Sequence, residues 1–68
     1  MDSNYIIERL KSTLYKYPTM IILQTRLNNL DEESKNEILI SLKKQLYRES
    51  NMDIQQQLST LVYPLMAS

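Results

Sequence analysis

The amino-acid sequence predicts an all-α protein, a small bundle of three to four short helices packed antiparallel or orthogonally in one domain over residues 1–68. Three observations predict this fold. The chain has no glycine, the residue that hairpin turns and phosphate-binding loops use to reach positive φ angles. Apolar side chains recur three and four residues apart, which is the spacing of one helix face. Prolines and acidic capping residues separate these stretches every few turns.

The first helix is expected from about Asn4 to Tyr17, with Asp2 or Ser3 as its N-cap. Pro18 ends it, because the residue before a proline avoids the α region. The core stripe of this helix would be Ile6, Leu10, Leu14 and Tyr17.

The second helix is expected from about Thr19 to Asn29, after Pro18, whose missing N–H costs nothing in a first turn. Ile21 and Ile22 point away from its main stripe. The helix is therefore apolar nearly all round, and because such helices are usually buried, we expect it to be the central one. Its main stripe would be Met20, Leu23, Leu27 and Leu30.

The third helix is expected to follow Asp31, whose carboxylate can accept hydrogen bonds from the first free N–H groups, and to run to about Glu49. Glu33 and Glu37 on this helix form a like-charge pair four residues apart, which costs a little stability. The inward stripe would be Ile38, Leu39, Leu42 and Leu46.

The fourth helix is expected to begin after Ser50 or Asn51, either of which can cap it. Pro64 predicts that regular helix ends near Val62, because proline lacks the N–H that continues the ladder. The shared apolar face would be Ile54, Leu58, Leu61, Val62 and Leu65.

The composition argues against catalysis. Histidine and cysteine are missing, which removes the commonest general base, the thiolate nucleophile and the usual soft metal ligands. The acidic clusters, Glu32 with Glu33 and Glu37 with Asp53, are expected to be solvated, whereas a carboxylate acid–base pair needs one member in an apolar pocket. We therefore expect no enzyme activity, no cofactor and no metal.

Charge and length point to association with other chains. Eight basic and eight acidic side chains give no long-range attraction to nucleic acid and no mutual repulsion between copies. A core in so short a chain seldom contributes more than about 3–5 kcal/mol, so a homodimer is expected.

The longest apolar run, Met20–Leu23, is far shorter than the ~20 residues that cross a bilayer, and the N-terminus lacks a secretory pattern, so we expect a cytoplasmic protein. The Ile, Lys, Asn and Tyr usage is typical of an AT-rich genome, such as that of a virus, phage or plasmid.

Two surfaces are candidates for binding a protein partner. Ile40 and Tyr47 lie together on the side of the third helix opposite its core stripe, where a partner could bind them. The alternatives are that another helix of the chain covers them or that they are exposed without a binding role. Residues 54–68 carry no charged side chain. Either the fold covers this segment, or Tyr63, Leu65 and Met66 dock on a partner.

A basic patch provides the alternative function. Lys43, Lys44 and Arg48 surround Tyr47, and cations beside an aromatic ring can hold a single nucleic-acid strand. Binding through this patch would weaken steeply with salt, whereas protein binding would not.

One stretch carries a resemblance to a known family. Residues 27–31, Ile38, Ser41–Leu42 and Leu46–Arg48 are similar to the helical hairpin of the Rop family of plasmid copy-control proteins. The resemblance implies a dimeric four-helix bundle that binds paired RNA hairpins. Pro18 interrupts the region where that family has one long helix, so the chain is not assigned to it, and the resemblance supports only a dimer and the RNA-binding alternative.

The interpretation that we favour is a small non-catalytic interaction or regulatory module, of the inhibitor or adaptor type, that binds a protein through a helix surface. The alternative is a dimeric RNA-binding protein that uses the basic face of the third helix. The predicted partner-binding residues are Ile40, Lys43, Lys44, Tyr47, Arg48, Tyr63, Leu65 and Met66.

Overall fold

The computed structural model describes residues 1–67, which form four helices and no strand. Short connections at residues 13–15, 29–31 and 49–51 join the helices. None of the helices in this range combines the length and the apolarity that crossing a bilayer would require. The all-α bundle is therefore confirmed. Its elements are α1 (Ser3–Ser12), α2 (Lys16–Asn28), α3 (Glu32–Arg48) and α4 (Met52–Ala67).

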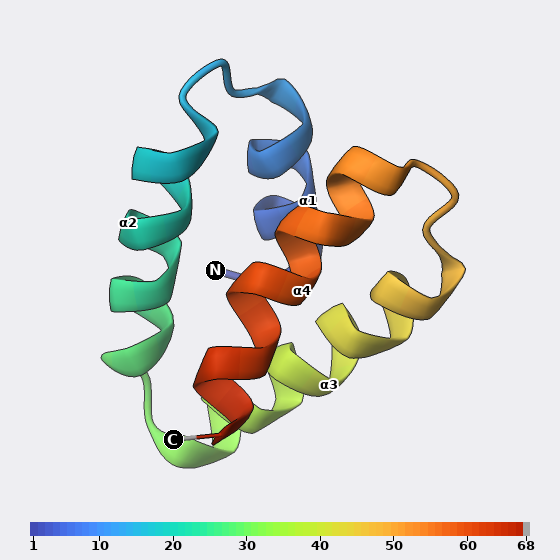
Figure 1. Cartoon of the computed structure of the whole chain (residues 1–68). Coiled ribbons are helices and arrows are strands. Elements are labelled where there is room, and N and C mark those ends of the chain that lie inside the picture. Colours follow the sequence, from blue (N-terminus) through green and yellow to red (C-terminus); the bar gives the residue numbers. More distant parts are fainter. Residues whose placement is uncertain (68) are drawn as a thin grey trace.

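The central element is α4, which packs against each of the other three helices (Figure 1). Its buried side chains cover a broad arc, whereas those of α2 form one stripe and leave Ile21 and Ile22 exposed. The expectation that the second helix is central is therefore wrong. Ile21 and Ile22 of α2 lie on its exposed side, whereas α4 carries no charged side chain after Asp53 and can bury a wider arc. The core consists of Ile6, Ile7, Leu10, Met20, Leu23, Leu27, Leu39, Leu42, Leu46, Ile54, Leu58, Leu61, Val62 and Leu65.

Side-chain caps begin three of the helices as their residue types predict. The Asp2 carboxylate accepts a hydrogen bond from the Tyr5 N–H, and the Asp31 carboxylate accepts one from the Ser34 N–H. Asn51 Oδ1 accepts from the N–H groups of both Asp53 and Ile54, so Asn51 rather than Ser50 caps α4.

The first helix is shorter than expected, because α1 ends at Ser12 and α2 already begins at Lys16. Pro18 is the third residue of α2, a position that needs no intrahelical N–H bond. In one continuous helix its ring would clash with the carbonyl group four residues earlier, at Leu14. The chain therefore breaks before Leu14, where the Thr13 hydroxyl accepts a hydrogen bond from the Tyr15 N–H at 3.0 Å. As a result Leu14 and Tyr17 lie outside the core, with exposed fractions of 92% and 74%.

The last helix is longer than expected, because α4 continues through Pro64 to Ala67. Proline cannot donate to the carbonyl group of Thr60, which would lose its intrahelical partner. Gln24 of α2 donates a hydrogen bond from Nε2 to that carbonyl oxygen at 3.4 Å. A neighbouring helix thus replaces the donor that Pro64 lacks.

Candidate protein-binding surface

Large apolar and aromatic side chains remain exposed in two regions of the bundle. The first comprises α1, α2 and their connection, and the second comprises the outer sides of α3 and α4. The exposed members of the first region are Met1, Tyr5, Leu14, Tyr15, Tyr17, Ile21 and Ile22, and those of the second are Ile40, Tyr47, Met52, Tyr63 and Met66.

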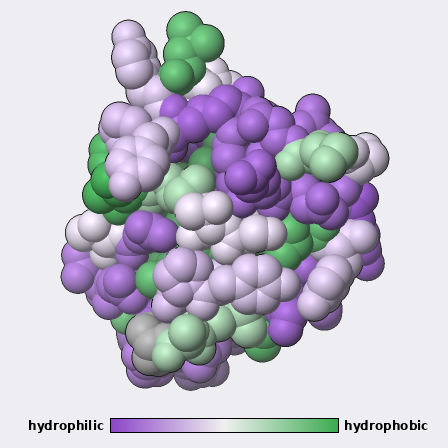
Figure 2. Space-filling view, viewed as in Figure 1, coloured by the Kyte–Doolittle hydropathy of each residue, from purple (hydrophilic) through white to green (hydrophobic). Residues whose placement is uncertain are grey.

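A surface groove of about 320 Å³ lies between α3 and α4. We call it the α3–α4 groove. Helical spacing explains its composition, because α4 residues three, four and seven apart share one side of the helix. No charged side chain lines it, and pale and light green side chains run through the middle and lower part of the face over α4 (Figure 2). The lining residues are Leu46, Tyr47, Met52, Gln55, Gln56, Ser59 and Tyr63.

Two tyrosines from different helices meet at this groove. Tyr47 of α3 is 71% exposed and Tyr63 of α4 is 46% exposed. A hydrogen bond with Tyr47 raises the pKa of the Tyr63 phenol above its usual value, because the bond favours the protonated form. The stabilisation from this bond is complete below the pKa of an unfolded tyrosine and is lost as pH rises through the raised value. Tyr47 and Tyr63 therefore lie next to each other at the groove.

The predicted pair of Ile40 and Tyr47 does not share one cavity. Ile40 lines a second groove, of about 330 Å³, together with Leu65 and Met66 at the far end of α4. Leu65 is only 6% exposed and belongs to the core, so little of its side chain is accessible to a partner, contrary to the predicted docking of this residue. It lies on the buried arc of α4, whereas Tyr63 and Met66 lie on its exposed side. The structure thus brings Tyr47 together with Tyr63, and Ile40 together with Met66.

The predicted basic patch is divided between two sides of α3. Lys43 is partly buried, whereas Lys44 and Arg48 are exposed. Consecutive helical residues point about 100° apart, so Lys43 turns toward α4 and Lys44 turns away from it. Glu37 shares the exposed row with Lys44 and Arg48 and reduces its positive charge. The three cations therefore do not form one continuous phosphate-binding face.

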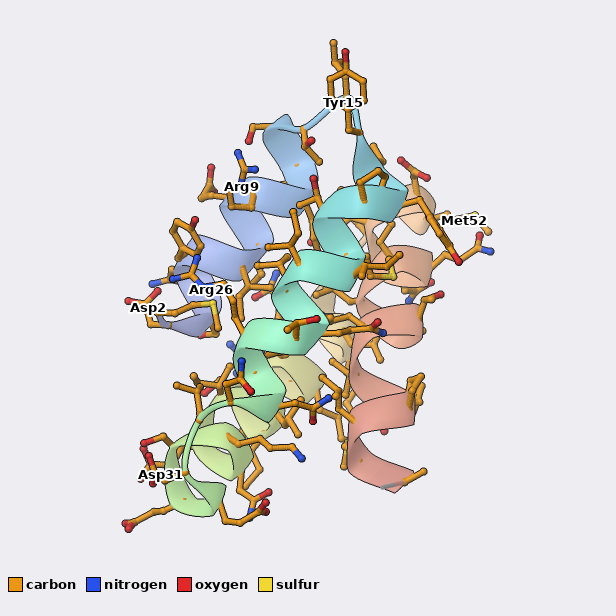
Figure 3. All side chains as sticks on the ribbon, turned by 90° about the vertical axis from the view of Figure 1, so that its left-hand side faces the viewer. Asp2, Arg9, Tyr15, Arg26, Asp31 and Met52 are labelled. Carbon is orange, nitrogen blue, oxygen red and sulfur yellow. The ribbon has the colours of Figure 1, made fainter. Side chains whose placement is uncertain are left out.

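The exposure of Leu14 and Tyr17, next to the connection between α1 and α2, was missed at the sequence level. Leu14 and Tyr17 were expected in the core, yet the break at residues 13–15 leaves them at the end of the bundle. Figure 3 shows Tyr15 projecting from this end. It also shows Arg26 of α2 reaching toward α1. The Arg26 guanidinium lies 5.7 Å from the centre of the Tyr5 ring, in a cation–π contact. The position of Pro18 relative to Leu14 was the signal that could have revealed the break.

The ionisable groups of residues 1–67 include two carboxyl groups with lowered pKa values and no cluster of metal ligands. No group of three or more acidic side chains in this range could hold a metal ion. Hydrogen bonds from Ser34 lower the pKa of the Asp31 carboxyl, and bonds from the Asn51 N–H and the Gln45 side chain lower that of Glu49. These shifts are opposite to the raised pKa that a carboxylic general acid requires.

Comparison of the chain with protein-family models, with curated proteins and with solved structures yields no match. The resemblance of residues 27–48 to the Rop family therefore gains no support.

Proposed function

We propose that the chain is a non-catalytic interaction module, of the inhibitor or adaptor type, that binds an uncharged apolar segment of another protein in the α3–α4 groove. One observation carries this proposal. Tyr47, Met52 and Tyr63, from two helices, line a single groove in which no side chain is charged.

The side chains of the groove have the chemistry of protein interfaces. Tyrosine presents a large rigid ring at a low cost in conformational entropy, and its hydroxyl group can bond to a partner. Methionine adapts its shape to apolar surfaces, and Met52 is 80% exposed. Gln55 and Gln56 at the same groove offer amide donors and acceptors for a partner backbone.

The charge distribution indicates which segment would fit. From Ile54 to the end of the described chain, α4 carries no charged side chain. A charged side chain placed in the groove would lose water without gaining an opposite charge, which is unfavourable. An apolar helix face with a few amide or hydroxyl groups brings no charge that would have to lose its water. Such a face is therefore the expected partner.

Site-specific photocrosslinking tests the proposal in the organism that encodes the protein. A photoreactive phenylalanine derivative replaces Gln55, which is exposed at the groove. The matched control places the same group at Glu8, which is exposed on α1. We expect the Gln55 variant to capture one protein, the Glu8 variant not to capture it, and the purified pair to re-form the complex.

Two outcomes would contradict the proposal. Equal capture from both positions would show that the groove has no preference for a partner. Capture of nucleic acid, with an affinity that falls steeply as salt concentration rises, would favour the RNA-binding alternative.

A further inference from the structure

The outer side of α3 carries a second surface that the α3–α4 groove does not use. Five exposed residues follow one another along it and lie within about 80° of the helix circumference at 100° per residue. We call them the α3 stripe. Figure 1 shows α3 at the edge of the bundle, with the other helices on one side of it. The stripe consists of Glu33, Glu37, Ile40, Lys44 and Arg48.

The charges of the stripe are not paired within the chain. Across residues 1–67 the one salt bridge joins Lys16 to Asp53, at 3.0 Å, and none involves α3. Glu33 and Glu37 are like charges four residues apart, and so are Lys44 and Arg48. Each of these pairs costs the isolated helix a few tenths of a kcal/mol. The stripe therefore has an acidic half and a basic half, each repelling itself.

The two halves are arranged symmetrically. Glu37 and Lys44 lie equally far on either side of the peptide bond between residues 40 and 41, and Glu33 and Arg48 do so as well. A two-fold axis through this point, perpendicular to α3, would bring each acidic residue opposite a basic residue of a second copy. Such self-complementarity is what an isologous dimer interface requires.

The helix dipole explains only part of this pattern. Acidic residues in a first turn and basic residues in a last turn stabilise any helix, which accounts for Glu33 and Arg48. The dipole effect fades within one turn, so it does not account for Glu37 and Lys44 in the middle. Ile40, which is 53% exposed, lies between these two residues and would meet its own copy at the axis.

We infer that α3 pairs antiparallel with α3 of a second copy of this chain, through ion pairs Glu37–Lys44 and Glu33–Arg48 around Ile40. A second copy fits the stripe because it supplies the complementary charges in the matching register. One helix covers less than the ~800 Å² per partner of a standard interface, so the dimer is weak and depends on protein concentration. The inference does not rest on the proposed function, because none of the five residues lines the α3–α4 groove.

Sedimentation equilibrium of charge-reversed variants at low salt tests the inference. Glu37→Lys places two like-charge contacts in the dimer, so we expect its dissociation constant to rise about tenfold or more. Within one chain the same change converts the repulsive Glu33–Glu37 pair into an attractive one, so the helix itself is not weakened. The double variant Glu37→Lys with Lys44→Glu is expected to recover most of the wild-type association.

The matched control is Glu8→Lys, which makes the same change of net charge on α1, away from the stripe. It should leave the association within about twofold of the wild type, and added salt should weaken the wild-type dimer. A wild-type chain that stays monomeric at high concentration and low salt would overturn the inference. It would also be overturned if Glu8→Lys acted as strongly as Glu37→Lys, or if the double variant stayed as weak as the single one.

Discussion

At the scale of single residues, Gln57 is a buried amide whose hydrogen bonding is incomplete. Its side chain is 8% exposed, and its Nε2 group donates a hydrogen bond to Asp53 at 3.3 Å. Its Oε1 atom accepts no hydrogen bond from the part of the chain that the structure describes. A buried acceptor that gave up water without a new partner costs about 1–3 kcal/mol.

Replacing Gln57 with methionine should therefore stabilise the protein. The Gln57→Met variant keeps the length of the side chain and removes the unpaired acceptor. We expect the free energy of unfolding, from urea titration followed by circular dichroism, to rise by about 1 kcal/mol. The exposed neighbour Gln56 provides the control. The Gln56→Met variant should change the free energy of unfolding by less than about 0.5 kcal/mol. A lower stability of Gln57→Met would mean that the amide contributes more than it costs.

Single residues also differ in how far the sequence could predict them. Asp31 and the cap at Asn51 were predictable, because a cap depends only on the residue and the three that follow it. The exposure of Leu14 was not predictable, because it depends on where the first helix ends rather than on the apolar spacing. Leu65 shows the reverse case, because its predicted core position is confirmed while its predicted role in binding stays a prediction.

At the scale of elements, the two prolines act differently from the simple expectation that proline ends a helix. Pro18 lies in the first turn of α2 and Pro64 in the last turn of α4. Sequence reasoning located both, but it could not foresee that Gln24 of another helix would bond to the Thr60 carbonyl group. A long-range donor of this kind is invisible to local rules, so the end of α4 was misplaced by several residues.

A double-mutant cycle can test whether Gln24 compensates for Pro64. We expect Gln24→Ala alone to lower the free energy of unfolding by about 0.5 kcal/mol, because the Thr60 carbonyl group loses its donor. In a Pro64→Ala background the helix supplies its own donor, so Gln24→Ala should have almost no effect. Thermal unfolding of the four proteins gives the coupling. Equal losses in both backgrounds would contradict the proposed compensation.

At the scale of the whole molecule, stability depends on how the other helices pack around α4. Leu58 is fully buried on this helix, and a chain of this length typically has a stability of only about 3–10 kcal/mol. Leu58→Ala should cost about 2–5 kcal/mol and should populate the unfolded state even in dilute urea. Leu14→Ala removes the same atoms from an exposed position, so it should change the stability by less than about 0.5 kcal/mol. Similar losses in the two variants would contradict the assigned core.

The whole molecule also sets the limit of what the sequence could predict about binding. Apolar spacing predicted the four helices and most of the core, because each stripe is a local property. The pairing of Tyr47 with Tyr63 was not predicted, since it depends on how α3 and α4 lie against each other. Tyr47 and Ile40 share a side of one helix, yet the neighbouring helix assigns them to different grooves.

The most direct test of the central claim is the affinity of the captured partner protein for two tyrosine variants. Tyr63 lies in the α3–α4 groove and Tyr5 lies on α1, and the two are exposed to a similar extent, 46% and 43%. Isothermal titration calorimetry should show that Tyr63→Ala weakens binding by about tenfold or more, while Tyr5→Ala stays within about twofold of the wild type. Equal affinities of the two variants, or a loss confined to Tyr5→Ala, would contradict the claim that the α3–α4 groove is the binding surface.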